Sequence, residues 1–182
     1  MFQRVAILLA TGALTASCMA GGGAPLPSCP MPAVSSLSAP PAAVAAGPVR
    51  SWRAVLVAGD DSSPAFDNGI GTLRERLAAQ GVRDISTLSA SGGNASVTNL
   101  QAALGTNRSG GACFVYLTSH GATEGFFLRP GRCLMAPAAL EEALNEGCGA
   151  APTVVVVSAC HSGTFLTDTM RQPNRIILTA AA

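Results

Sequence analysis

The fold of this chain is decided by two stretches of sequence, FVYLTSHG at residues 114–121 and VVVVSACHSG at residues 154–163. Each begins with an apolar run that predicts a strand buried on both faces of a parallel sheet. Each run is followed by a reactive side chain, His120 in the first stretch and Cys160 in the second. Ligands bind to such sheets outside the carboxyl ends of the strands. If the two strands are neighbours, which lie about 4.8 Å apart in a sheet, His120 and Cys160 meet at one rim.

The remaining sequence alternates between predicted strands and helices. Further strands are expected at residues 54–58, 85–88 and 175–179. Helices are expected between Ile70 and Ala78, from the capping pair Thr98 and Gln101 to Leu104, and from Pro137 to Leu144. Short apolar runs at 125–128 and 133–135 flank a turn signal and predict a small hairpin beside the site. The pattern predicts an α/β fold, a three-layer sandwich with a mostly parallel sheet.

His120 and Cys160 have the chemistry of a cysteine–histidine dyad. A thiol is only slightly ionised near neutral pH, so a nucleophilic cysteine needs a partner that accepts its proton. We interpret Cys160 as the nucleophile and His120 as that partner. Gly121 leaves its backbone N–H open to a substrate oxygen, and we expect it to form an oxyanion hole with the N–H of Cys160. Gly163 predicts the tight turn that lets Cys160 stand clear of the sheet.

Other interpretations of these residues are weaker. A cysteine after a valine run is ordinarily a buried structural residue, but the flanking residues here favour a nucleophile. His161 should point away from Cys160 along the chain, so we interpret it as a pocket-lining or surface residue, with the role of base as the minority alternative. A zinc site from Cys160, His161 and His120 lacks a second close pair of ligands, and no Gly-x-Ser-x-Gly elbow is present for a serine hydrolase. We expect no metal and no cofactor.

Composition narrows the class of protein. The chain has 182 residues and a formal net charge of +1, with 12% charged residues and no lysine. The length allows one domain of ordinary size, and the lack of a basic stripe excludes nucleic acid as an expected partner. Residues 21–50 are rich in Ala, Pro, Gly and Ser without apolar periodicity, so we interpret them as a linker. The domain then occupies residues 51–182.

Residues 1–20 have the pattern of an export leader. One positive charge precedes the apolar run Val5–Ala16, which has signal-peptide length and is too short to span a bilayer. Two alternatives remain open: cleavage at a small-residue site near Ser17 or Ala20, or lipidation of Cys18 in a near match to the lipoprotein box. We expect an exported protein, in the periplasm or lipid-anchored to the bacterial envelope.

The other cysteines can form disulfides in an exported protein. A nucleophilic Cys160 must stay out of any bridge, so Cys133 with Cys148 is the pair to test first. Cys113 falls within a predicted strand, where a small buried hydrophobe is the simpler interpretation.

Two blocks of sequence resemble the legumain family of cysteine peptidases, in the caspase and legumain group. Thr118-Ser119-His120-Gly121 is similar to that family's His-Gly block, and Ser158-Ala159-Cys160-His161-Ser162-Gly163 is similar to its Ala-Cys-x-Ser-Gly block. The blocks occur in the family's order, and the similarity covers roughly residues 53–182. The resemblance implies a caspase-like fold and a cysteine endopeptidase that acts on protein or peptide substrates through an acyl-enzyme thioester, with Cys160 as nucleophile and His120 as general acid/base.

Three features bear on how far the resemblance extends. The family places an asparagine after its first strand, where it helps orient the histidine, and Asn68 is the candidate for that role; a helix N-cap fits its position equally well. Ile70 stands where legumains carry an arginine that holds an Asn or Asp side chain of the substrate. Legumain-like enzymes also continue beyond the strand at 175–179 with sheet that walls the substrate pocket. We expect the natural chain to extend beyond Ala182, or two chains to form a homodimer through the last strand.

The sequence therefore supports an exported cysteine endopeptidase as the first hypothesis, because both reactive blocks are intact. The second hypothesis is a catalytically inactive caspase-like module that binds or scaffolds at the cell envelope, favoured by the missing arginine and pocket wall. A transpeptidase is the third, since an amine can resolve an acyl-enzyme as water does.

Overall fold

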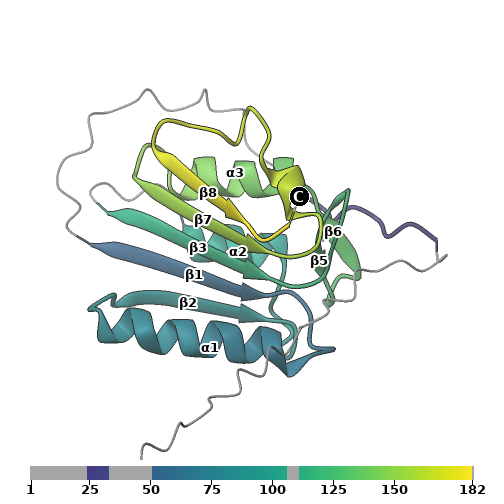
Figure 1. Ribbon diagram of the computed structural model, residues 1–182, viewed down its shortest axis with the longest axis horizontal. Coiled ribbons are helices and arrows are strands. Elements are labelled where there is room, and N and C mark those ends of the chain that lie inside the picture. The colour runs from purple at the N-terminus through teal and green to yellow at the C-terminus, as the bar shows by residue number, and fades with distance from the viewer. Residues whose placement is uncertain (1–23, 33–50, 106–110, 182) are drawn as a thin grey trace, which may run out of the picture.

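The computed structural model describes residues 24–32, 51–105 and 111–181. Within these ranges, a five-stranded sheet has the order β2-β1-β3-β7-β8, and every neighbouring pair is parallel. Its strands are β1 (Trp52–Ala58), β2 (Asp84–Ser89), β3 (Ala112–Thr118), β7 (Thr153–Ser158) and β8 (Arg175–Thr179). A small antiparallel sheet of β4 (Gly121–Ala122), β5 (Gly125–Leu128) and β6 (Cys133–Met135) lies at the end to which the central strands point (Figure 1).

Helices cover the two faces of the central sheet unequally. The larger core lies against α2 (Val97–Leu104) and α3 (Pro137–Gly147), and its members include Val55, Val57, Val115, Leu117, Val155, Val157, Leu100 and Leu140. The smaller core lies on the other face, where α1 (Pro64–Ala79) packs Ile70 against Ala54, Leu56 and Ala58 of β1. This arrangement confirms the predicted α/β sandwich with a parallel sheet.

The expectation of strands buried on both faces holds for β1 but not for the later strands. Along β7 buried residues alternate with partly exposed ones. On β8 the side chains of Ile176 and Leu178 are 59% and 52% exposed. The reason is the position of α1, which lies beside β1 and β2 and does not reach β7 and β8 (Figure 1).

Two helices begin at other residues than the sequence pattern predicts. The N-cap of α1 is Ser63, whose hydroxyl accepts a hydrogen bond from the Ala65 N–H, so Asn68 lies within the helix and is not its cap. The N-cap of α2 is Ser96, whose hydroxyl accepts from the Asn99 N–H at 3.1 Å. The predicted capping pair of Thr98 and Gln101 is therefore wrong by two residues, because Ser96, two positions before Thr98, supplies the capping hydroxyl.

The disulfides differ from the predicted pairing. Cys29 is bonded to Cys133 of β6, and Cys113 of β3 is bonded to Cys148, the C-cap of α3. The expected Cys133–Cys148 pair is wrong, and Cys113 is half of a disulfide as well as a buried residue. Spacing along the chain did not show these pairs, because the fold brings Cys29 to Cys133 across 104 residues.

The first of these disulfides joins the segment at residues 24–32 to the small sheet. The N–H of Cys29 donates to the Leu134 carbonyl, and the N–H of Leu134 donates to the Pro27 carbonyl, each at 2.9 Å. Part of the predicted linker thus lies alongside β6. The predicted leader and the rest of the linker fall outside the described residues. In the ranges that the structure does describe, no helix has the length and apolar character needed to cross a membrane.

Candidate active site

The register between β3 and β7 brings the two reactive blocks together. Thr118 lies opposite Ser158 as the last pair of the ladder, and the Ser119 N–H donates to the Ser158 carbonyl at 3.2 Å. His120 and Cys160 each follow two residues beyond that pair. Gly121 lies so close to the second block that a Cβ placed on it would be 2.2 Å from the carbonyl oxygen of Cys160. The structure therefore places the two blocks side by side at the carboxyl rim, as the sequence predicts.

The backbone turns sharply directly after Cys160. His161 has a φ of 55° in the left-handed region, and the 3-10 helix η1 (Ser162–Phe165) begins after it. The turn that the sequence pattern assigned to Gly163 is thus made at His161, whose side chain is exposed. Such backbone strain in a residue other than glycine is found where a surrounding structure enforces it, and functional sites are frequent places for it.

A buried serine fixes the loop after Cys160. The hydroxyl of Ser162 accepts hydrogen bonds from the N–H groups of Ala180 and Ala181, each at 3.0 Å. The N–H of Gly163 donates to the Ala181 carbonyl at 2.7 Å. The segment that follows β8 is therefore attached to the loop that carries Cys160.

Cys160 is in the disulfide-bonded form in this structure. The expectation that Cys160 stays out of any bridge is therefore not met in this structure. The thiolate is the nucleophilic form of cysteine. Nucleophilic chemistry at Cys160 thus requires prior reduction of this bond by a thiol or another reductant.

The side chain of His120 contacts polar and aromatic groups from the loop after β1 and from α1. Its Nε2 is 3.3 Å from the hydroxyl oxygen of Ser62 and 3.4 Å from Oδ2 of Asp60. The edge of the ring meets Phe66, with 5.4 Å between ring centroids. The side chain of His120 keeps 25% exposure, so one part of the imidazole faces solvent.

Asp60 is a buried carboxylate with several donors. Its Oδ1 accepts from the Ser62 N–H at 3.1 Å, its Oδ2 accepts from the Ser62 hydroxyl at 2.7 Å, and Arg129 forms an ion pair with it. Burial alone would raise the pKa of the Asp60 carboxyl, but the hydrogen bonds from Arg129 and Ser62 outweigh it and lower the pKa from 3.8 to about 2. Arg129 also contacts Asp61 at 2.6 Å, and its hydrogen bond to Asp60 raises its pKa.

The backbone around Asp60 is held between two strands. The N–H of Gly59 donates to the Thr118 carbonyl of β3 at 2.9 Å, and the Gly59 carbonyl accepts from the Arg129 N–H at 2.8 Å. A Cβ on Gly59 would lie 2.3 Å from the carbonyl oxygen of Phe127, so only glycine allows this approach. These contacts fix the loop that presents Asp60 and Ser62 to His120.

Comparison with known proteins identifies the family. The model of the peptidase C13 family matches residues 87–182, a stretch that is more than half of the chain and includes both reactive blocks. The chain belongs to the peptidase C13 family. No curated protein matches it in sequence. The resemblance to the legumain family is therefore confirmed, and the parallel sheet with flanking helices agrees with the caspase-like fold of C13 peptidases.

Membership in the C13 family supports a cysteine peptidase function. The matched region includes His120, Gly121 and Cys160, but the loop that holds Asp60 and Ser62 precedes it. Among the described residues, no group of three or more His, Cys, Asp or Glu side chains is arranged to hold a metal ion.

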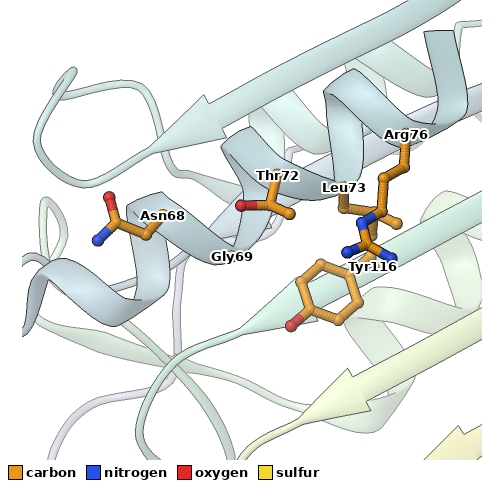
Figure 2. Close-up of a pocket in the computed structure, with 6 residues that line it drawn as sticks. All are labelled: Asn68, Gly69, Thr72, Leu73, Arg76 and Tyr116. Carbon is orange, nitrogen blue, oxygen red and sulfur yellow. The ribbon is translucent and has the colours of Figure 1, made fainter. Parts of the chain in front are cut away.

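Among the described residues, no hydrogen bond joins Asn68 to His120, the residue that the family pattern would have it orient. Asn68 lies on the second turn of α1, where it lines a shallow hollow of about 470 Å³ together with Gly69, Thr72, Leu73, Arg76 and Tyr116 (Figure 2). In the part of the chain that the structure describes, the polar contacts of the His120 ring are with Asp60 and Ser62. Ile70, at the position compared with the legumain arginine, is 5% exposed and packs in the smaller core.

Sequence reasoning missed Asp60, Ser62 and Arg129. A signal for Asp60 was present, because it follows the buried strand β1 at the same rim as His120 and Cys160. The sequence Gly59-Asp60-Asp61-Ser62 also has the composition of an ordinary turn, and that reading hid the carboxylate. Arg129 gave no such signal, since its approach to Asp60 depends on where the hairpin of β5 and β6 folds.

The low pKa of Asp60 predicts an acid-dependent loss of stability. A depressed carboxyl pKa stabilises the folded state above the unfolded value of 3.8, and this contribution disappears as the pH falls toward about 2. The contribution is at most about 2.5 kcal/mol. Urea unfolding at pH 5 and at pH 2.5 should show a larger loss for the wild type than for Asp60→Asn. Equal losses in the two proteins would contradict this role of the carboxylate.

Proposed function

We propose that this C13 peptidase is an endopeptidase in which Cys160 attacks the peptide carbonyl and His120 acts as general acid/base. The observation that carries the proposal is the β3–β7 register, which aligns the two residues at one rim. The exposed edge of His120 and the partial exposure of Cys160 give a substrate access to both. Family membership supports the same chemistry.

The proposed reaction has two halves. His120 accepts the proton of the Cys160 thiol, and the thiolate forms a bond to the carbonyl carbon of the substrate. His120 then gives that proton to the leaving amine as the peptide bond breaks, which leaves a thioester on Cys160. In the second half, water attacks the thioester, His120 takes a proton from it, and the acid is released with return of the proton to sulfur. An amine in place of water would make the reaction a transpeptidation.

Gly121 and Cys160 are the proposed donors of the oxyanion hole. Their backbones are in direct contact across the rim, since a Cβ on Gly121 would overlap the Cys160 carbonyl. Two N–H groups from adjacent blocks can bind the oxygen that becomes negatively charged in the tetrahedral intermediate. The close approach also explains why the histidine is followed by glycine.

The inactive-module hypothesis is not favoured, since both reactive blocks lie within the match to a peptidase family. A fluorogenic peptide library, assayed with and without a reductant, tests the proposed activity. Cleavage is expected after reduction, because Cys160 is otherwise in a disulfide. Circular dichroism of the same sample monitors the fold under reducing conditions. A reduced and folded protein that cleaves no peptide would argue for the inactive module.

We expect the cleavage profile of this library to show no dominance of Asn or Asp at the cleaved position, because Ile70 is in the core and offers the substrate no charged group.

Export is the proposed localisation, to the periplasm or to a lipid anchor at Cys18 on the bacterial envelope. It is supported by the two disulfides between described cysteines, because such bonds persist in oxidising compartments. Fractionation of cells that express the full chain tests the anchor. Cys18→Ser should move a lipid-anchored protein from the membrane to the soluble fraction. A variant that stays in the membrane would exclude both lipidation at Cys18 and ordinary signal cleavage.

A homodimer through β8 is a further part of the proposal. Ile176 and Leu178 present an apolar face on β8, the strand at one edge of the described sheet, and proteins normally cover such a surface or add charge to it. Ile176→Lys and Leu178→Lys should convert a dimer to a monomer in light scattering without loss of fold. A wild-type protein that is monomeric at about 100 μM, well above the Kd expected of a specific interface, would rule out this dimer.

A further inference from the structure

We propose that Asp60 and Ser62 are positioning residues that fix the hydrogen of His120 on Nε2 and leave Nδ1 as the nitrogen that exchanges a proton with the nucleophile. The inference rests on the proposed function of His120 as general acid/base. Neither residue lies in the stretch that matches the C13 family. Both come from the loop after β1, where the family expectation had pointed to Asn68 instead.

The hydrogen-bond capacity of Asp60 and Ser62 determines which group donates to the other. The Asp60 carboxylate can only accept hydrogen bonds, and its Oδ2 accepts one from the Ser62 hydroxyl at 2.7 Å. A hydroxyl has one proton, so the Ser62 oxygen has only lone pairs left to offer toward His120. That oxygen lies 3.3 Å from Nε2, and Oδ2 of Asp60 lies 3.4 Å from the same nitrogen. Nε2 faces two acceptors and must therefore be the donor.

This arrangement decides the tautomer of the neutral ring. A neutral imidazole has one N–H and one bare nitrogen. With the hydrogen held on Nε2, Nδ1 is the only ring nitrogen that can accept a proton. The hydrogen bond made by one ring nitrogen of a histidine commonly determines whether the other nitrogen carries a proton or accepts one.

The support for Asp60 makes it a fixed acceptor. Arg129 pairs with the carboxylate, and the Ser62 N–H donates to Oδ1, so Oδ2 keeps its orientation toward His120. Gly59 is clamped between β3 and the residue that begins the turn after β5. A purely structural Asp60–Arg129 pair would not require the second oxygen to face the imidazole.

Asp60→Asn is the decisive variant because it keeps the shape of the side chain and replaces one acceptor oxygen with a donor NH₂ group. The amide oxygen can replace Oδ1 toward Arg129 and the Ser62 N–H, which leaves the NH₂ group in place of Oδ2. That group donates to the Ser62 oxygen, the hydroxyl proton turns toward Nε2, and Nε2 must become an acceptor. The hydrogen of His120 then moves to Nδ1, where it blocks proton transfer.

Long-range ¹H–¹⁵N spectra of protein labelled on histidine measure the tautomer directly. The chain contains 2 histidines, so two ring systems are expected, and His161→Gln assigns them. At about pH 9, where an ordinary imidazole is neutral, His120 should have its hydrogen on Nε2 in the wild type and on Nδ1 in Asp60→Asn. A wild-type ring with hydrogen on Nδ1, or an unchanged ring in Asp60→Asn, would overturn the proposal.

Kinetics supply the second readout. Asp60→Asn should lower kcat by at least about 100-fold with KM nearly unchanged, because a wrong tautomer affects the chemical step and not binding. Asp61→Asn is the matched control: Asp61 contacts Arg129 at 2.6 Å but is 41% exposed, and its substitution should leave both the tautomer and kcat unchanged. Ser62→Ala removes the bridging hydroxyl without disturbing Arg129 and should lower kcat by about 10-fold. An Asp61→Asn protein as impaired as Asp60→Asn would reduce Asp60 to a structural role.

The tautomer does not depend on turnover, so the two hypotheses can fail separately. If the reduced wild type cleaves no peptide but shows hydrogen on Nε2 that moves in Asp60→Asn, the positioning geometry stands and the proposed peptidase activity does not. If peptides are cleaved and kcat is unaffected by Asp60→Asn, the peptidase stands and the positioning role does not.

Discussion

Cys160→Ala and His120→Ala are each expected to lower peptide cleavage by at least about 1,000-fold, and the double variant to be hardly slower than either. The reason is that the two residues act as one unit, so loss of either partner leaves the other with no function. The measurement is kcat/KM of the reduced protein for a peptide selected from the library.

The control for this prediction is His161→Ala. His161 follows the nucleophile and is exposed, and no hydrogen bond of its side chain occurs within the described residues, so this variant should retain most of the activity. If His161→Ala were inactive while His120→Ala cleaved normally, His161 would be the base and the β3–β7 register would not identify the active site.

Gly121→Ala is expected to lower kcat by about 100-fold or more while the protein still folds. The added Cβ would lie 2.2 Å from the carbonyl oxygen of Cys160 and 3.1 Å from the Ala159 side chain. Because the first of these atoms belongs to the backbone, the contact can be relieved only by moving one of the two backbone segments that carry His120 and Cys160. A displacement of about 1 Å at a reacting group can cost about 100-fold in rate.

Gly71→Ala is the matched control for Gly121→Ala. Gly71 lies on the exposed side of α1, and a Cβ there meets no atom within 4 Å. Alanine in a helix interior is more favourable than glycine by about 0.5–1 kcal/mol, so this variant should be slightly more stable and fully active. A Gly121→Ala enzyme with wild-type kcat would show that the two blocks are not in contact at this point.

Much of the fold could be predicted because strand ends are well marked in the sequence. The valine run before Cys160 and the apolar run before His120 each end at a polar residue, and both became adjacent parallel strands. The last strand was predicted with its observed bounds, Arg175–Thr179. In these segments the apolar run correctly marks a strand, since the strands of parallel sheets are typically near-continuous apolar runs.

The exposed face of β7 and β8 could not be predicted from the same pattern. Continuous apolar sequence indicates that a strand can be buried on both faces, but burial depends on which helix lies over it. Here α1 lies over β1 and β2 and leaves Ile176 and Leu178 half-exposed. The position of a crossover helix is a tertiary property, which strand composition does not encode.

The candidate site was predicted in part for a related reason. His120 and Cys160 carry their chemistry in their residue type, so a strand-end position was enough to suggest them. Aspartate is a common residue in turns, so its type alone did not mark Asp60. Its importance comes from its burial, from the ion pair with Arg129 and from the short distance to His120. The disulfide pairs were missed because only the folded chain brings the sulfurs within bonding distance.

Covalent labelling measures whether Cys160 is a nucleophile that His120 activates. Full-length protein is incubated with a thiol-directed acyloxymethyl ketone probe, with and without a reductant, and the modified residue is mapped by mass spectrometry of its peptides. We predict a single adduct on Cys160 that requires the reductant, persists in His161→Ala and is lost in His120→Ala. An adduct on another cysteine, or labelling of Cys160 that is unchanged in His120→Ala, would contradict an active site built from these two residues.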